Sequence, residues 1–530
     1  MKSLLSVLLI AINFLTSAQS VKFTSEESIQ QKYPNGLNLD EDKSTTSFHD
    51  GNNTIVIECN VPKIGFFEYS GVYHNQKSRV TIHKYDANGD EISLNKPENG
   101  KQEFGPILPV TIEFNKKILL FYFKNSDNDA LKLFVSELDK NDLSLLNTKE
   151  VCTYGQHNAD VLPSKKGILI QQFLRLSADK MKLLLVVPVY KDELFTCVFS
   201  SDMSVLRKKV SQIEIKEYLM ISEALVENTG NNIIVFKDFV MPGHSNGMFI
   251  PSFKAILLQK VNNSELLIDV KSLEEEHRLV DAHLGLSIHS SKTVLFGDYL
   301  EKNWGAGIWA TDIETENLKI NKPLLIPYPE DFAKRVYHVG FGDRNGDKYG
   351  LETVDYELVE FENGDLAVCG SPTNKGLNGE FFMNTGRGIS LAASIYSGPI
   401  MVTFISSNKK QNVFTMIPRY ISSSSGSKGI YVPYKNKLIV LYNDFEKNIN
   451  GELIDDDVHQ KKKGDLSLAY ATILKDGTIE GRKILEEWSS KSEFYRTKNA
   501  NIISDRKILI PSFHTEKKSN VIKVANITIE

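Results

Sequence analysis

Side chains that could bind a metal ion gather in one short segment of the chain. Asp343, Asn345 and Asp347 carry oxygen atoms at alternate positions of the sequence Asp-Arg-Asn-Gly-Asp. Calcium prefers carboxylate and amide oxygens of this kind, and the backbone carbonyl of Tyr349 and the side chain of Glu352 could complete its shell. Calcium is therefore the one cofactor that the sequence suggests.

The segment departs from the best-known calcium motif at two positions. An EF-hand loop has Gly at its sixth position and Glu at its twelfth, whereas this chain has Lys348 and Val354 there. A polar turn that leads into the strand expected over residues 354–361 is therefore the favoured alternative.

Four ring-bearing side chains are candidates for contact with a ligand. Trp304, Trp309, Tyr337 and His338 stand in or near segments that we expect to be loops. Binding residues are often carried on loops held by a rigid scaffold. Ordinary packing inside the protein is the favoured alternative for each of the four.

No motif in the sequence assigns catalytic residues. Residues 243–247 match the Gly-x-Ser-x-Gly nucleophile motif, but that motif needs a following helix, and residues 248–251 continue toward another strand. The eleven histidines include no His-Glu-x-x-His pair. Carboxylates for glycoside hydrolysis cannot be selected from spacing alone. Catalytic residues stay unassigned, and a protein that is not an enzyme is favoured.

The elements that must hold these residues follow a recurrent pattern. Short apolar strands run into turns rich in Asp, Asn and Gly, and continue into strands opened by Leu or Ile. Residues 132–138, for example, turn at residues 139–142 and resume at 143–145, and residues 467–473 turn at 475–477 and resume at 478–479. The crossings are centred on Tyr85, Leu138, Phe199, Val261, Ile313, Ile395, Ile473 and Ile527.

Self-similar units of this kind indicate a repeat architecture. Each unit offers about four strands, which is the content of a propeller blade. The sequence therefore predicts an all-β fold, a β-propeller of about eight four-stranded blades, with seven blades as the alternative. No linker or change in composition divides the chain, so residues 21–530 are expected to form a single domain with insertions near 329–353 and 371–387.

The two ends of the chain are expected to pair. Few residues follow Ile527, so the last unit lacks its outer strand, whereas Val21 to Phe23 is a spare extended piece. Pairing of these strands would close the ring without an exposed edge. Helical pattern is scarce: a short helix is expected over residues 25–33, and residues 273–281 fit either a helix or a strand and turn.

Residues 1–20 have the pattern of a signal peptide. Lys2 precedes an apolar run from Leu4 to Leu15 that is too short to span a bilayer, and small residues near Ala18 suit a signal peptidase. The protein is therefore expected to be exported to the periplasm or the extracellular space. No second apolar run reaches the length of a membrane span, so none is expected.

Charge and cysteine content narrow the remaining classes. The formal net charge of −5 does not suit a phosphate backbone, so nucleic-acid binding is not expected. Four cysteines without a Cys-x-x-Cys pair do not form a disulfide framework, and we expect Cys59, Cys152, Cys197 and Cys369 to be buried apolar residues, with one pairing as the alternative.

The chain resembles a known group of propellers in style. Residues 177–183 look like the Ser-x-Asp-x-x-x-Leu hairpin of TolB-like and other bacterial β-propellers, and residues 305–310 with Asp312 and Leu318 are similar to a blade strand pair of that group. The resemblance to secreted bacterial propellers implies an architecture and assigns no functional residue.

Two functions are open. The favoured one is an exported propeller that binds an extracytoplasmic protein, peptide or glycan. The alternative is a hydrolase or lyase acting on a carbohydrate-like substrate at the central channel. An enzyme should bring paired carboxylates or a carboxylate–histidine set together in that channel, whereas a binding protein should expose apolar side chains on its outside.

Overall fold

A computed structural model of the protein describes residues 21–24, 31–33, 43–50, 53–60, 78–86, 91–97, 104–105, 109–125, 131–153, 167–168, 173–190, 192–213, 218–238, 253–274, 277–287, 292–301, 304–332, 353–376, 394–407, 411–419, 421–423, 429–449, 466–486, 494–495, 501–504, 507–516 and 519–529. The chain divides into two compact units. Unit 1 falls within Met1–Asn35, Thr373–Ile400 and Thr415–Glu530, and unit 2 within Gly36–Pro372 and Met401–Phe414.

Five antiparallel sheets follow one another along unit 2. Sheet 1 consists of β3 (Lys43–Asp50), β4 (Asn53–Asn60), β5 (Arg79–Tyr85) and β6 (Glu91–Asn95), and sheet 2 of β7 (Val110–Phe114), β8 (Lys117–Asn125), β9 (Leu131–Leu138) and β10 (Leu145–Thr153). Sheet 3 consists of β12 (Phe173–Leu176), β13 (Lys182–Tyr190), β14 (Glu193–Ser200) and β15 (Val205–Gln212). Sheet 4 consists of β16 (Tyr218–Val226), β17 (Asn232–Asp238), β18 (Phe253–Gln259) and β19 (Glu265–Asp269), with the short parallel β11 (Gly167–Ile168) beside β16. Sheet 5 consists of β20 (Arg278–Ser287), β21 (Lys292–Glu301), β22 (Trp304–Glu314), β23 (Lys319–Ile320) and β24 (Leu324–Pro327).

Three further sheets complete the described strands. Sheet 6 consists of β25 (Thr353–Glu360), β26 (Leu366–Gly376), β27 (Ser394–Ser397), β28 (Ile400–Ile405), β29 (Asn412–Ile417) and β30 (Ile421–Ser423). In unit 1, sheet 7 consists of β31 (Ile430–Tyr434), β32 (Lys437–Phe445), β33 (Leu466–Leu474) and β34 (Ile479–Glu486). Sheet 8 consists of β35 (Phe494–Tyr495), β36 (Asn501–Ser504), β37 (Lys507–Glu516) and β38 (Ser519–Ile529), joined by β1 (Val21–Thr24) and β2 (Gln31–Tyr33). The helices that the structure describes from end to end are η2 (Val270–Ser272), η3 (Thr315–Asn317) and α3 (Glu446–Ile449).

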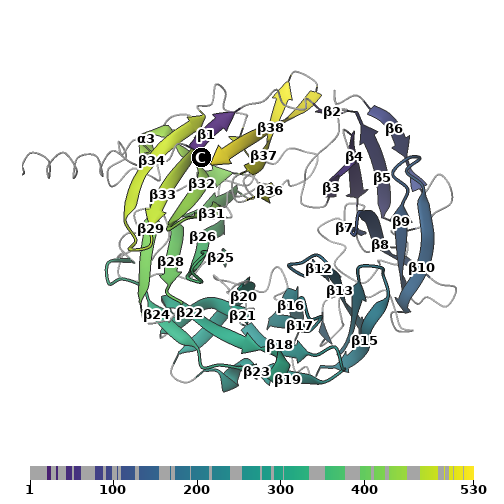
Figure 1. Ribbon diagram of the computed structural model, residues 1–530, viewed down its shortest axis with the longest axis horizontal. Coiled ribbons are helices and arrows are strands. Elements are labelled where there is room, and N and C mark those ends of the chain that lie inside the picture. The colour runs from purple at the N-terminus through teal and green to yellow at the C-terminus, as the bar shows by residue number, and fades with distance from the viewer. Residues whose placement is uncertain are drawn as a thin grey trace, which may run out of the picture. The chain divides into compact units, whose positions relative to one another are not determined.

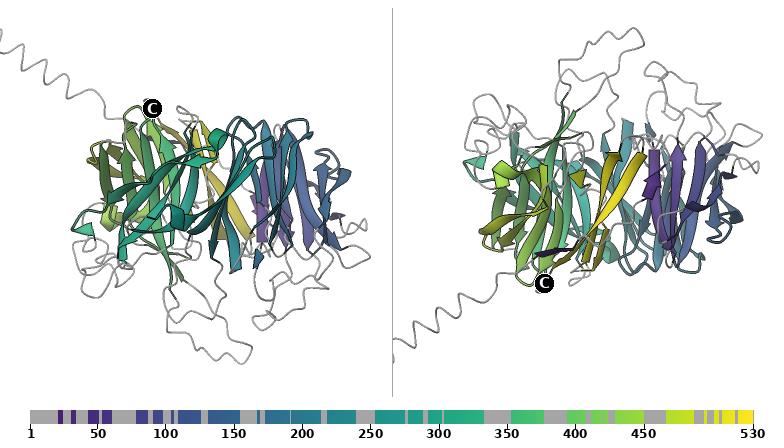
Figure 2. Two further views of the ribbon diagram at one scale, coloured as in Figure 1. Left: turned by 90° about the horizontal axis from the view of Figure 1, so that it is seen from below. Right: turned by 90° about the horizontal axis from the view of Figure 1, so that it is seen from above.

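Apolar residues on both faces of the middle strands hold neighbouring sheets of unit 2 together. On β13, Leu183 and Leu185 belong to a core cluster shared with sheet 2, whereas Leu184 and Val186 belong to a cluster shared with sheet 4. Because side chains alternate across a strand, one continuous apolar run buries itself against two neighbours. Figure 2 shows the strands of sheets 1 and 2, in purple and blue, standing side by side.

Side chains also bridge successive sheets by binding the next sheet's turn. Lys84 Nζ donates to the Lys140 carbonyl at 2.7 Å, and Asn115 Nδ2 donates to the Ser201 carbonyl at 2.9 Å. The same contact recurs from Lys209 Nζ to the Asn263 carbonyl, at 2.9 Å. These bonds occupy backbone carbonyls that tight turns leave without a strand partner.

The predicted fold class is confirmed. The described strands form eight consecutive sheets of four to six strands, and this is the construction of a β-propeller. Figure 1 shows that, within unit 2, first strands such as β12, β16 and β20 lie on one side of their sheets and fourth strands such as β15 and β19 on the other. The prediction of one domain over residues 21–530 stays a prediction.

The predicted pairing of the chain ends is confirmed as well. β1 runs antiparallel to β38, with Val21 opposite Ile529 and Phe23 opposite Ile527. The helix expected over residues 25–33 is wrong at its end, because Gln31 to Tyr33 form β2, which also pairs with β38. Residues 273–281 take the strand-and-turn alternative, since β20 begins at Arg278.

Six of the crossing centres lie where a third strand turns into a fourth, as expected. The centre at Ile395 is wrong: it lies in β27, which pairs with the end of β26 and with β30, and the third-to-fourth turn of sheet 6 lies between Ile405 and Asn412. Residues 371–376, at the start of the second expected insertion, belong to β26.

The four cysteines are buried, as the sequence predicts. Burial raises the pKa of the Cys152 and Cys197 thiols to about 12, so both remain neutral. In the part of the chain that the structure describes, no helix is long and apolar enough to cross a membrane.

Candidate functional site

A cluster of titratable side chains lies on and beside the first strands of sheets 4, 5 and 6. We call it the first-strand cluster, and its members are Glu223 on β16, Asp281 and His283 on β20, Asp298 on β21, Tyr328 after β24 and Tyr356 on β25. Figure 1 shows β16, β20 and β25 on the same side of unit 2.

A bulge in β20 places Asp281. Val280 pairs with Asp298 and His283 with Phe296, so Asp281 and Ala282 together oppose the single residue Gly297. Asp281 has a φ of 51°, which is rare for a residue other than glycine. Bulges redirect side chains and are frequent beside functional sites.

Gly297 is required for this bulge. A Cβ atom on Gly297 would lie 2.2 Å from the Asp281 carbonyl oxygen and 3.1 Å from Trp309 Nε1. No side chain fits at this position. Because glycine has none, the bulged backbone of β20 can approach β21 closely.

A second bulge places Glu223. Ile221 pairs with Phe236 and Glu223 with Val235 in the register of β16 and β17, so Ser222 is the extra residue. The bulge of β20 lies on the edge strand of sheet 5, and the bulge of β16 lies beyond Tyr218 and Leu219, the residues of β16 that pair with β11. Bulges are frequent where a strand has no partner on one side.

His283 lies between two carboxylates. Its Nδ1 is 3.3 Å from Glu223 Oε1, and its Nε2 is 3.3 Å from Asp281 Oδ2, the second contact being an ion pair without hydrogen-bond alignment. The ring stacks on Phe296 and meets Tyr356 edge-on, with centroid distances of 5.9 and 5.5 Å. The imidazole of His283 thereby joins β20 to β16, through Glu223, and to β25, through Tyr356.

Asp281 and His283 are both ionised at neutral pH. Burial favours neutral His283, but the negative charges of Asp281 and Glu223 outweigh burial and raise the pKa of His283 to about 10. Burial likewise opposes ionisation of Asp281, but the positive charge of His283 outweighs it and lowers the pKa of that carboxyl. His283 is therefore a cation and not a general base at neutral pH.

The environment of Asp298 raises the pKa of its carboxyl, whereas that of Asp281 lowers it. Its side chain is fully buried, and the hydroxyls of Tyr328 and Tyr356 donate to its Oδ1 at 2.7 and 2.8 Å. Burial raises the pKa of Asp298 to about 7 although the two hydroxyls lower it. The carboxyl can therefore gain or lose a proton near neutral pH, whereas Asp281 stays ionised.

An aromatic group adjoins Asp298. Tyr328 stacks on Phe332 with a centroid distance of 4.1 Å, and Phe414 meets Tyr328 edge-on at 5.3 Å. Asp298 itself is fully buried, so a ligand could reach this carboxyl only if side chains around it moved.

The predicted ligand-binding residues do not join this cluster as a set. Trp304 is half-buried on β22, and Trp309 is fully buried, stacked on Phe253 at 5.8 Å. Trp309 thus takes the packing role that the sequence left open. Tyr337 and His338 lie outside the described residues.

The predicted calcium ligands also lie outside the described residues; they are Asp343, Asn345, Asp347 and Glu352. Within the described ranges, no group of three or more His, Cys, Asp or Glu residues is placed to hold a metal ion. Calcium therefore stays a prediction for residues 343–352.

Sequence reasoning missed the first-strand cluster. Glu223 and His283 are 60 residues apart, and neither bulge has a local signature. The available signal was weak: the charged pair Asp281 and His283 interrupts an otherwise apolar strand.

The chain matches no family model and no curated protein. Among solved structures, it is similar to the WD40 domain of SCAP from fission yeast, with 11% identity, 94% of this chain and 98% of that chain covered, and a TM-score of 0.37. It is also similar to the β-propeller domain of the Trilobed protease from Pyrococcus furiosus (9% identity, 85% and 100% covered, TM-score 0.32) and to TolB from Acinetobacter baumannii (9% identity, 81% and 78% covered, TM-score 0.25). At these scores the similarities assign neither an activity nor a partner.

Proposed function

We propose that the protein is an exported binding protein that holds an extracytoplasmic protein or peptide on the fourth strands of its sheets. The observation that carries this proposal is where the large apolar side chains are exposed. Seven of the eight that are exposed in the described residues lie on fourth strands: Ile92 and Leu94 on β6, Leu146 on β10, Val205, Leu206 and Val210 on β15, and Leu266 on β19. Apolar side chains that gather on one kind of element suit an interface better than single scattered ones.

Strand β15 offers the largest share of this surface. Lys209 and Ser211 point toward sheet 4, where both bind Glu265, at 2.8 and 2.6 Å. Lys208 and Val210 point the opposite way, and Lys208 Nζ reaches the Val151 carbonyl of β10 at 3.3 Å. Val205 and Val210 are 53% and 52% exposed on either side of this lysine.

The chemistry of this surface defines the partner. Leu206 is an extra residue in the register of β14 and β15, and two lysines follow it. A bulge and lysines blunt an edge strand against pairing with another strand. The partner is therefore a segment that contacts side chains, with apolar groups for the valines and a carboxylate for Lys208.

The first-strand cluster supports a binding protein because its histidine is already occupied. His283 is held between Asp281 and Glu223, and its high pKa removes it as a base. The cluster joins sheets 4, 5 and 6, and so it stiffens the scaffold beside β19, the fourth strand of sheet 4.

The test uses short random peptides displayed on phage and selected on the immobilised full chain. Selected peptides should combine apolar and acidic residues, and the double variant Val205→Ser/Val210→Ser should weaken their binding at least about tenfold, since each buried valine contributes roughly 1.5 kcal/mol. Met181→Ser is the matched control, because Met181 is 47% exposed but lies outside the fourth strands. Equal loss of binding in the control, or none in the double variant, would refute the proposal.

One observation favours the alternative, a hydrolase acting on a carbohydrate-like substrate. Asp298 and Asp281 are carboxyls whose pKa values are shifted in opposite directions, as in a pair that divides acid and base roles. The full burial of Asp298 weighs against it. Hydrolysis of a panel of nitrophenyl glycosides by the wild type, abolished by Asp298→Asn, would establish this alternative.

A further inference from the structure

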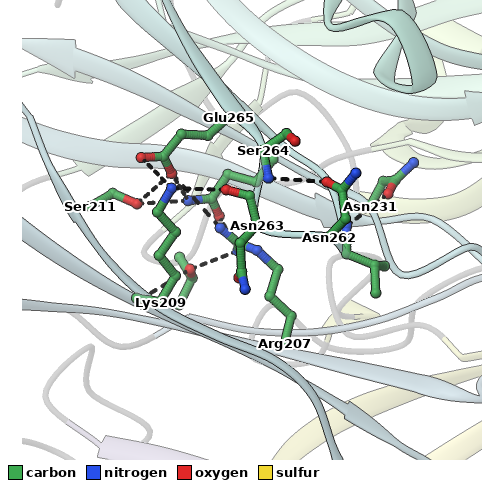
Figure 3. A network of polar contacts seen from close by, with 11 residues as sticks. Arg207, Lys209, Ser211, Asn231, Asn262, Asn263, Ser264 and Glu265 are labelled. Atoms are coloured by element: carbon green, nitrogen blue, oxygen red, sulfur yellow. Dashed lines mark hydrogen bonds and ion pairs between the residues drawn. The ribbon is translucent and has the colours of Figure 1, made fainter.

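A buried arginine lies at the interface of sheets 3 and 4. Arg207 of β15 is fully buried, and its Nη1 donates to Thr196 Oγ1 at 2.9 Å and to Gln259 Oε1 at 2.6 Å. Its Nε and Nη2 hydrogens meet no acceptor among the described residues. Figure 3 shows the guanidinium group within the surrounding polar network.

The carboxylate that pairs with Arg207 is shared with Lys209. Glu265 Oε2 is 3.8 Å from Arg207 Nη2 and already accepts hydrogen bonds from Ser211 Oγ at 2.6 Å and Gln259 Nε2 at 2.9 Å. Glu265 Oε1 is 2.8 Å from Lys209 Nζ, so Lys209 balances the charge of Glu265. Arg207, Lys209 and Glu265 together keep one positive charge.

Asn232 brings further unpaired groups to the same place. It is fully buried, and neither Nδ2 nor Oδ1 has a hydrogen-bond partner among the described residues. Asn232 lies directly opposite Gln259 in the register of β17 and β18, so the two side chains share one face of sheet 4. Gln259 also accepts from Arg207, so Gln259 lies beside both of these side chains.

Buried polar groups without partners are rare, and each costs free energy unless a water or an ion satisfies it. Three of the four unpaired atoms here are donors: Arg207 Nε, Arg207 Nη2 and Asn232 Nδ2. Burial lowers the pKa of Arg207 to about 10, which still leaves it charged at neutral pH. Donors around a net positive charge suit an anion and repel a metal cation.

We propose that Arg207 and Asn232 bind a small monovalent anion of the chloride class between sheets 3 and 4. The anion accepts from the guanidinium and from Asn232 Nδ2, while Asn232 Oδ1 accepts from a bound water. The site neutralises the buried guanidinium and joins the two sheets that carry β15 and β19. It is independent of the proposed binding function.

The first experiment compares thermal unfolding of the full chain in sodium chloride and in sodium gluconate at equal ionic strength. A ligand that binds only the folded state raises the melting temperature, and chloride above its dissociation constant should raise that of the wild type by roughly 2 °C. Equal melting temperatures of the wild type in the two salts would overturn the proposal and leave water as the occupant.

Two variants separate specific binding from general salt effects. Asn232→Asp supplies a carboxylate beside Arg207, so it should melt at a higher temperature than the wild type in gluconate and lose the response to chloride. Asn262→Asp adds the same charge in the exposed β18–β19 turn and should keep the wild-type response. A chloride response that persists in Asn232→Asp would overturn the site.

Crystals grown in sodium bromide give a direct readout. An anomalous peak within hydrogen-bond distance of Arg207 and Asn232 is expected in the wild type and should be absent in Asn232→Asp. A wild-type peak found only at exposed lysines would show an adventitious ion only and would contradict the proposal.

Discussion

Phe23 lies opposite Ile527, in the register that pairs β1 with β38. β38 continues beyond this pair to Ile529, and Ile527 and Ile529 are both buried. Two segments separated by nearly the whole chain thereby complete one sheet, and the outer edge of β38 is covered.

Removal of β1 should therefore destabilise sheet 8. A chain that begins at residue 25 exposes one side of β38, at a cost of about 2 kcal/mol for each isoleucine that becomes solvent-exposed. The control is a chain that begins at residue 21, which lacks only the predicted signal peptide. Urea unfolding should give a lower midpoint for the shorter chain, and identical midpoints would show that β1 does not contribute.

Gly297→Ala should disrupt the bulge that places Asp281. The new Cβ would lie 2.2 Å from the Asp281 carbonyl oxygen, and because that atom belongs to the backbone it cannot rotate away. We expect a loss of about 3 kcal/mol in the free energy of unfolding. Gly481→Ala is the matched control, since its Cβ would meet nothing within 4 Å. Equal unfolding free energies of the two variants would contradict the assignment.

The sequence predicts those parts of the fold whose turns are set by adjacent residues. Asp476 Oδ1 accepts from the Thr478 amide and Gly477 has a φ of 84°, so the turn after Ile473 is encoded by adjacent residues. Ile395 lies in an equally apolar strand, but its partners Lys375 and Ser423 are set by long-range pairing. A pattern of apolar strands cannot distinguish these two cases.

The candidate site could not be predicted in the same way. His283 meets Glu223 only because Ser222 and Asp281 interrupt two ladders, and a bulge depends on the partner strand as much as on its own residues. Asp298 resembles any other strand aspartate in the sequence, and its pKa depends on burial and on hydrogen bonds from Tyr328 and Tyr356, which lie later in the chain.

Calcium should stabilise the chain if residues 343–352 bind it. Excess calcium is then expected to raise the melting temperature relative to a chelator, and Asp343→Ala/Asp347→Ala should remove the difference, since two of the carboxylate ligands are lost. An unchanged melting temperature of the wild type in the two conditions would leave the polar turn as the correct interpretation.

Asp298 should make the protein less stable as pH rises from about 4 to 7. Its pKa is 3.8 in the unfolded reference and about 7 in the fold, so between these values the folded state binds one more proton. The contribution of Asp298 is greatest below pH 4 and falls by about 4 kcal/mol by pH 7. Urea unfolding of Asp298→Asn across this range should lack that decline.

Asp142→Asn is the control for Asp298. Asp142 lies in an exposed turn, where hydrogen bonds from Ser144 lower the pKa of its carboxyl. Its replacement should leave the slope between pH 4 and 7 unchanged. A wild-type slope that survives in Asp298→Asn would assign the decline to other groups.

His283 should act in a higher pH range. Its pKa is 6.5 in the unfolded reference and about 10 in the fold, so its contribution is fully present below pH 6.5 and lost as pH rises through 10. His283→Gln removes the cation between Asp281 and Glu223 and should cost about 3 kcal/mol at pH 7, because two carboxylates are left close together. Between pH 7 and 10 the variant should lose less stability than the wild type.

The double variant His283→Gln/Glu223→Gln should regain part of the loss at pH 7, since one of the two charges is gone. Parallel pH curves for the wild type and His283→Gln would show that this histidine is not protonated in the folded protein.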